Sequence, residues 1–135
     1  MSNLPIFDVA GSAMTAQSVR LSTIASNLAN ANSVSGDPDA VFRAKQPVFS
    51  ATAIDGNPAL AGVRVDAVDE STAAPLRRYE PGHPLADAQG YVYAPDIDPV
   101  AQMVDLISAS RSYQANVEVF NSAKELALAT LNMGR

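Results

Sequence analysis

Apolar residues recur at alternating spacings of three and four near both ends of this chain of 135 residues, and this pattern constrains the fold more than any other feature. The N-terminal seam comprises Phe7, Ala10, Met14, Gln17, Leu21, Ile24, Leu28 and Ala31, of which only Gln17 is polar. Such a heptad stripe is typical of a helix that packs along another helix. Pro5 suits the start of this helix, and the run from Asn30 to Ser33 suits its end.

A second seam follows Pro99 and comprises Met103, Leu106, Ser110, Tyr113, Val117, Phe120, Lys124, Ala127 and Leu131, with Ser110 and Lys124 as polar exceptions. Asp96 or Asp98 is a candidate cap for this helix, and Gly134 suits its end. Helices of about 25 to 33 residues are about 40 to 50 Å long, which exceeds the diameter of a small globule. We therefore predict that the two helices pair along their seams as an antiparallel coiled coil. An ordinary helical hairpin with a solvated outer surface is the alternative.

The charge of the chain divides it into three segments. Residues 37–98 contain ten of the fourteen acids and five of the nine bases, so the net charge of −5 lies wholly in this middle segment. Seven of the nine prolines lie there too. The sequence therefore predicts a helical core built from residues 1–36 and 99–135, with an acidic insert over residues 37–98.

The insert carries short strand patterns. Residues 62–68 alternate cleanly, residues 42–49 alternate with a break at Pro47, and residues 91–93 form a third short run. Turn residues occupy 55–58, and a loop is expected over 81–90. These features predict a small β-rich insert of hairpins that leans on the helices, and hence an α+β fold.

The composition excludes much chemistry. The chain has no Cys and one His, so we expect no disulfide, no metal site and no cofactor. The negative net charge opposes binding to phosphate backbones, and we expect no nucleic-acid partner and no small-molecule substrate.

Two motifs resemble functional sites only superficially. His83 is the one conventional general base, but no partnered nucleophile accompanies it, which favours a structural role in a turn. Asp96-Ile97-Asp98 resembles part of a calcium loop but lacks the bend glycine and the closing glutamate, so helix entry explains it better.

Small and basic residues elsewhere also have structural explanations. Ser108, Ser110 and Ser112 lie on a predicted helix without a nucleophile elbow, which indicates packing residues. Arg77 and Arg78 form too small a basic patch for nucleic acid, and we expect a salt bridge to Glu70 or Glu80 or a contact to an acidic neighbouring subunit. We expect that the chain is not an enzyme.

Three motifs resemble those of the flagellar basal-body rod protein family. Leu21-Ser-Thr-Ile-Ala-Ser-Asn-Leu-Ala-Asn-Ala-Asn32 resembles the N-terminal signature of flagellar axial proteins, and residues 103–117 resemble the C-terminal signature of rod and hook subunits. Residues 79–93 and the short length are similar to a proximal rod subunit. The chain departs from the family after the Asn-rich run, where Ser33-Val-Ser-Gly-Asp-Pro38 replaces a Thr-Pro-Gly-Tyr type of turn.

The resemblance implies a structural subunit of the proximal rod that assembles helically, transmits torque and is required for motility. It also implies export through the flagellar type III apparatus without a cleaved signal peptide, and assembly in the periplasm. The expected partners are other rod subunits, copies of the same chain and the export apparatus. The alternative is a soluble helical binding module, or an adaptor for a partner helix.

The expected assembly interface draws on both seams and on the Asn-rich run. It comprises Phe7, Met14, Leu21, Ile24, Leu28, Asn30, Asn32, Met103, Leu106, Tyr113, Asn116, Val117, Phe120 and Leu131.

Overall fold

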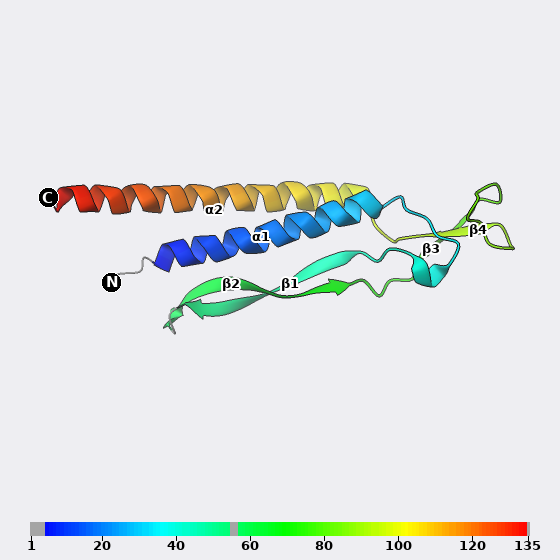
Figure 1. Ribbon diagram of the computed structural model, residues 1–135, viewed down its shortest axis with the longest axis horizontal. Coiled ribbons are helices and arrows are strands. Elements are labelled where there is room, and N and C mark those ends of the chain that lie inside the picture. Colours follow the sequence, from blue (N-terminus) through cyan, green and yellow to red (C-terminus); the bar gives the residue numbers. More distant parts are fainter. Residues whose placement is uncertain (1–4, 55–56, 135) are drawn as a thin grey trace.

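The computed structural model describes residues 5–54 and 57–134, which form an elongated α+β molecule (Figure 1). The elements in chain order are helix α1 (Pro5–Asn30), a short 3-10 helix η1 (Pro38–Ala40), strands β1 (Lys45–Ile54), β2 (Asn57–Glu70), β3 (Leu76–Tyr79) and β4 (Tyr91–Ala94), and helix α2 (Pro99–Met133). Helix α1 lies between α2 and the β1–β2 hairpin, and β3 and β4 lie at one end of the molecule. The predicted α+β class is confirmed.

The two helices run antiparallel. The rings of Phe7 and Phe120 meet edge to face with centroids 4.9 Å apart, and Arg20 and Asp105 form an ion pair of 3.5 Å. Residues later in α1 therefore contact residues earlier in α2. Asp98, rather than Asp96, caps α2 by accepting a hydrogen bond of 2.9 Å from the Val100 N–H.

The seam predicted for α2 is wrong at alternate positions. Ala109 and Ala123 are buried, with 0% and 7% of their surface exposed, whereas Met103 and Lys124 are exposed. The inner stripe thus uses the residue just before the predicted position at Ser110 and at Lys124. Small alanines at these points let the two helix backbones approach closely, while the predicted Phe120 still packs against Phe7.

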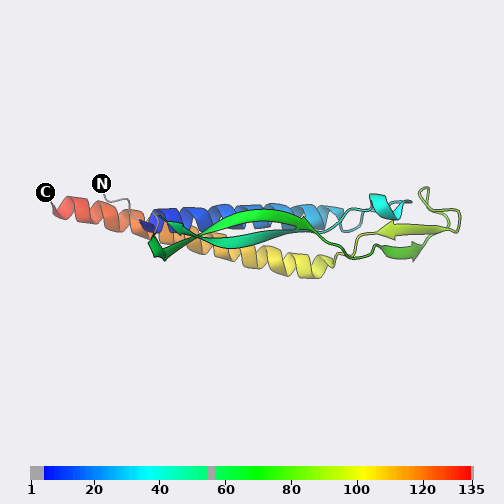
Figure 2. The same ribbon diagram turned by 90° about the horizontal axis from the view of Figure 1, so that it is seen from below.

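Helix α1 is buried on two sides because it has two neighbours (Figure 2). Its buried residues are Ala10, Ala16, Thr23, Ile24 and Asn27. A heptad seam alone predicts one buried side, and the hairpin covers the second. Gln17, the polar break in the seam, has a buried side-chain oxygen that accepts no hydrogen bond within the described residues.

The β1–β2 hairpin lies along α1, as expected for strands that lean on the helices. Its antiparallel register runs from Lys45 opposite Glu70 to Ile54 opposite Asn57, with an irregularity between Val48 and Phe49. The Val63 N–H donates a hydrogen bond of 3.1 Å to the Ser12 hydroxyl of α1. A Cβ atom at Gly62 would lie 2.8 Å from that hydroxyl, so glycine permits the close approach.

The strands differ in extent from those expected. β1 and β2 are longer than the predicted runs 42–49 and 62–68, and they include 57–58 of the predicted turn. Residues 55–56 of that turn lie outside the described residues. Strand β3 was not predicted, because Leu-Arg-Arg-Tyr carries no apolar alternation.

The strands β3 and β4 form the tip of the molecule. They pair antiparallel from Leu76 opposite Ala94 to Tyr79 opposite Tyr91. Ser35 adds to this sheet through two backbone hydrogen bonds of 2.8 Å to Tyr93, which places the segment after the Asn-rich run against β4.

Candidate assembly surfaces

Asn27 joins three elements through one side chain. Its amide nitrogen donates to the Lys45 carbonyl at 2.8 Å, and its amide oxygen accepts from the Lys45 N–H at 2.8 Å. The same nitrogen lies 3.1 Å from the Gln102 side-chain oxygen of α2. Asn27 is 3% exposed, so these hydrogen bonds satisfy polar groups that water does not reach. The root of the hairpin is thereby held to both helices.

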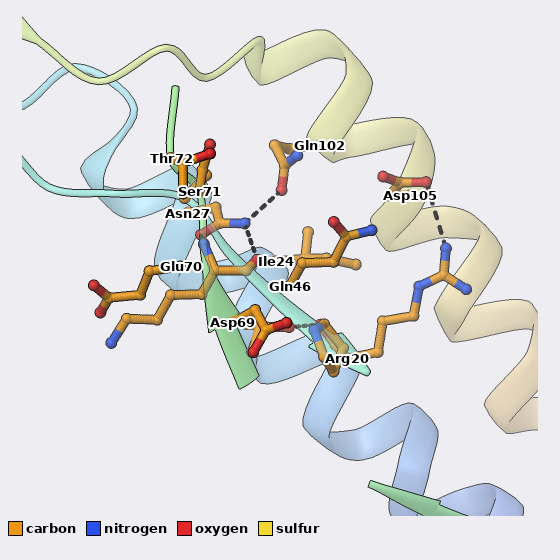
Figure 3. A pocket seen from close by; sticks show the side chains of 14 residues that line it. Arg20, Ile24, Asn27, Gln46, Asp69, Glu70, Ser71, Thr72, Gln102 and Asp105 are labelled. Atoms are coloured by element: carbon orange, nitrogen blue, oxygen red, sulfur yellow. Dashed lines mark hydrogen bonds and ion pairs between the residues drawn. The ribbon is translucent and has the colours of Figure 1, made fainter. Parts of the chain in front are cut away.

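A polar groove opens beside this joint (Figure 3). It has a volume of about 450 Å³ and lies between α1, α2 and the root of the hairpin. Its charged lining residues are Arg20, Lys45, Asp69, Glu70 and Asp105. Figure 3 shows Arg20 reaching across from α1 to Asp105 of α2. This mixed charge suits a solvated protein contact better than a buried small molecule.

The outer side of α2 carries an apolar stripe near its start. The α2 outer stripe consists of Val100, Met103, Val104 and Ile107, with 68%, 51%, 61% and 56% of their surfaces exposed. Their spacing of three and four residues places them on one face. By helical periodicity this face lies about half a turn away from the alanines that contact α1.

The tip is held by polar and aromatic contacts. The Asp87 carboxylate accepts hydrogen bonds from the N–H groups of Gln89 and Tyr91, each at 2.9 Å, and from the Tyr93 hydroxyl at 3.2 Å. The Tyr91 N–H is the main cause that holds the pKa of Asp87 below its ordinary value of 3.8, with smaller effects of Gln89, Tyr93 and Arg77. The Arg77 guanidinium lies 3.7 Å from the centroid of the Tyr91 ring.

Three further tip residues have the structural roles that the sequence suggested. Arg78 forms an ion pair with Glu80, one of the two predicted partners. His83 lies in a turn, where its Nδ1 atom accepts a hydrogen bond of 3.1 Å from the Leu85 N–H. No nucleophile pairs with this histidine among the residues that the structure describes.

The predicted interface residues fall into three groups in the single chain. Met103, Tyr113, Leu131 and Asn32 are exposed, whereas Ile24 is buried. The half-buried members are Phe7, Met14, Leu21, Leu28, Asn30, Leu106, Asn116, Val117 and Phe120. Asn30 and Asn116 each donate to a backbone carbonyl one turn earlier in their own helix, at Ser26 and Ser112.

Sequence reasoning missed Asn27 as a structural residue. It lies within the quoted N-terminal signature, one residue before Leu28, but the seam pattern draws attention to the apolar positions instead. The available signal was an amide one turn from the seam residues Ile24 and Ala31, because an amide that becomes buried there requires a hydrogen-bond partner.

The described residues hold neither a metal-binding cluster nor a membrane-spanning helix. No group of three or more His, Asp or Glu side chains is placed to hold a metal ion within residues 5–54 and 57–134. Neither described helix carries an apolar run long enough to span a bilayer.

Comparison with protein-family models gives two matches at the two ends of the chain. Residues 7–36 match the family described as flagella basal body rod protein, and residues 88–133 match the flagellar basal body rod FlgEFG protein C-terminal family. The first range covers α1 from its third residue onward, and the second contains β4 and α2. Both matches define the class as flagellar basal-body rod proteins.

Relatives that match along most of the chain identify one family within this class. The chain is 56% identical over 135 residues to the flagellar basal-body rod protein FlgC of Escherichia coli O157:H7, with both chains covered completely. It is 55% identical over the same length to FlgC of Salmonella typhimurium. FlgC of Aquifex aeolicus is 42% identical over 119 residues, covering 88% of this chain and 87% of the relative. The chain belongs to the FlgC family of flagellar basal-body rod proteins.

Proposed function

We propose that this chain is a structural subunit of the bacterial flagellar rod, in its proximal part, which assembles helically and transmits torque for motility. The observation that carries the proposal is the exposure of α2. Among its described residues this helix buries only Ala109 and Ala123 within the chain, while large apolar residues such as Val104 and Leu126 are exposed. A long helix of this kind needs neighbouring subunits to cover it. The FlgC relatives support the rod as the place where those neighbours occur.

We propose that α1 and α2 pair as a coiled coil in the assembled rod. The antiparallel contacts of Phe7 with Phe120 and of Arg20 with Asp105 support this pairing. Close-packed helices aligned with a shaft resist twisting, because packed side chains leave no space for the backbones to shift. Residues 1–36 and 99–135 then serve as the helical core, and residues 37–98 serve as an insert that contacts subunits farther out.

The predicted interface residues take two roles in this proposal. Exposed members such as Met103 and Leu131 contact neighbouring subunits directly. Inner members such as Ile24 and Phe120 hold the helix pair in a shape that can assemble. The partners are copies of this chain and other rod subunits, with the export apparatus as a transient partner.

We also propose an export route and a place of assembly for this chain. The chain passes through the flagellar type III apparatus and assembles in the periplasm as part of the basal body. The absence of Cys supports this route, since a chain that arrives unfolded in an oxidising space forms no wrong disulfides.

Electron microscopy of basal bodies from a deletion strain tests the function. A rod subunit is required for a complete rod, so the strain should show truncated basal bodies and no motility. Complete rods in the deletion strain would contradict the proposal and favour a soluble adaptor for a partner helix.

Substitutions in the same strain separate assembly from other roles. Ile24→Asp or Phe120→Asp should abolish rod assembly, because either change places a charge in the helix pair. His83→Ala should leave motility near normal, because its described contact is one turn hydrogen bond. Loss of motility with normal export in the histidine variant would show that the tip has an additional function.

A further inference from the structure

The side of the hairpin that faces away from α1 is apolar. Gly62 faces α1, since its Cβ position points at Ser12. Residues alternate across a strand and paired residues share a face, so the pairs on either side of Gly62 face outward. The outer hairpin face therefore comprises Phe49, Ala51, Ala53, Ala61 and Val63, which are all exposed.

This face is unusual for an exposed sheet. Phe49 and Val63 have 38% and 36% of their surfaces exposed, and no polar side chain separates them from the neighbouring alanines on that face. Strands with one solvated face normally carry polar residues there. The inward face carries the polar Ser50 and Thr52 beside Gly62 and Ile54. The outer hairpin face thus has the apolar composition of a surface that another protein surface covers.

The outer hairpin face and the α2 outer stripe lie on opposite sides of the molecule. Figure 1 shows α1 between the hairpin and α2, and the stripe faces away from α1. One chain cannot bring these two faces together. Two copies related head to tail can, and contacts between unlike faces build open arrays instead of closed dimers.

The charges near the two surfaces favour contact of an outer hairpin face with an α2 outer stripe over contact between two copies of the same surface. Residues 45–70 carry four acids and two bases, so two outer hairpin faces would bring like charges together. On α2, Arg111 lies one turn beyond Ile107 on the same face, is exposed, and has no ion-pair partner among the described residues. Two α2 outer stripes placed together would oppose their arginines, whereas a hairpin placed on the stripe supplies acids to Arg111.

We propose that the outer hairpin face of one copy of this chain docks on the α2 outer stripe of the next copy. The inference rests on the proposed function, since it names the contact through which copies of the chain meet in the rod. Each face comprises only four or five side chains, so a single contact is weak and gains strength when it repeats along an array.

Paired cysteines test this contact in assembled basal bodies. The chain has no Cys, so Val63→Cys and Val104→Cys introduce the only thiols. The double variant is expressed in the deletion strain, and isolated basal bodies are treated with a short thiol-reactive crosslinker. We expect dimers and higher multimers of the chain, with mass spectrometry identifying peptides that join position 63 to position 104. Each single variant should give no crosslinked multimer.

The matched control moves one thiol to the opposite face of the same hairpin. Thr52 lies opposite Gly62 on the inward side and is half-buried, so Thr52→Cys with Val104→Cys should crosslink at least tenfold less. Joining of 63 to 63, joining of 104 to 104, or adducts with a different protein would overturn the proposed contact. Basal bodies that contain the protein without a 63-to-104 crosslink would also overturn it and leave the rod function intact. Absence of the unsubstituted protein from isolated basal bodies would refute the rod function itself.

Discussion

At the scale of single residues, Asn27 does most to connect the parts of this molecule. Its amide matches the donor and the acceptor of the Lys45 backbone as a neighbouring strand would. A buried backbone N–H and carbonyl without such a partner lose their hydrogen bonds to water and form no others in exchange. The position of the hairpin on α1 therefore depends on one side chain of α1.

Asn27→Ala should open the root of the hairpin. Loss of the amide leaves the Lys45 N–H and carbonyl unpaired, which should lower the free energy of local opening by about 2 to 4 kcal/mol. Hydrogen exchange of the Lys45 amide measures this directly. Asn30→Ala is the matched control, because Asn30 bonds only within its own helix turn, and it should cost less than about 1 kcal/mol. Equal exchange in both variants would contradict this role of Asn27.

Asp87 makes the tip sensitive to acid. Because hydrogen bonds hold its pKa in the folded chain below the ordinary 3.8, the carboxylate contributes stability that is present above the unfolded pKa. That contribution is lost as the pH falls through the lower pKa of the folded state. The near-ultraviolet circular dichroism of the tip tyrosines should therefore weaken below about pH 3.8 before the helix signal is lost.

Asp87→Asn provides the control for the acid titration. Asparagine keeps an acceptor for the N–H groups of Gln89 and Tyr91 but has no carboxylate to titrate. The variant should lose the acid-dependent change in the tyrosine signal. A change that persists in the variant would assign the acid sensitivity to another group.

At the scale of elements, α2 shows how side-chain size determines which stripe of a helix faces its neighbour. The fully buried positions Ala109 and Ala123 are small, whereas exposed positions such as Val104 are large. A helix that faced its neighbour with the larger side chains would hold the two backbones farther apart. The observed orientation of α2 leaves larger side chains such as that of Val104 exposed in the single chain.

Substitutions at two consecutive residues distinguish the observed register from the heptad seam. Ala109→Leu should destabilise the helix pair by about 1 to 3 kcal/mol, because Ala109 is 0% exposed and added volume overpacks the contact. Ser110→Leu should cost less than about 1 kcal/mol, since Ser110 is half-buried at the edge of the contact. Urea titration followed by helix circular dichroism compares the two. A larger loss for Ser110→Leu would restore the predicted seam.

At the scale of the whole molecule, α2 extends past the start of α1 at Pro5 (Figure 1). The side chains of residues 128–134 are all exposed. A helical end with no packing partner is marginal in water, because a short helix gains too little from its backbone hydrogen bonds alone. Neighbouring subunits are therefore needed to hold this end of the shaft-like body.

Amide exchange should divide α2 into two parts in the free protein. Residues 128–134 should exchange at least tenfold faster than residues 102–120, which pack on α1, because the end frays without a neighbour. In isolated basal bodies both parts should be protected. Mass spectrometry of the two peptides measures the difference. Equal protection of both parts in the free protein would show that α2 is stable without neighbours.

Particular residues show how far the sequence alone determined this protein. The two helices and the turn role of His83 follow from local patterns, because each depends on residues close in the chain. Local patterns also offered Asp96 or Asp98 as the cap of α2 and Glu70 or Glu80 as salt-bridge partners of Arg78, and the structure selects Asp98 and Glu80. The family signatures likewise lie in continuous stretches.

Only the tertiary structure decided which faces meet. The buried stripe of α2, the second buried side of α1 and the Asn27 joint depend on how closely distant segments approach, and heptad spacing carries no information on that distance. Strand β3 forms because β4 pairs with it, and its own residues show no strand pattern. Periodicity thus determined the two helices, and side-chain volume together with buried hydrogen bonding determined how the elements are arranged.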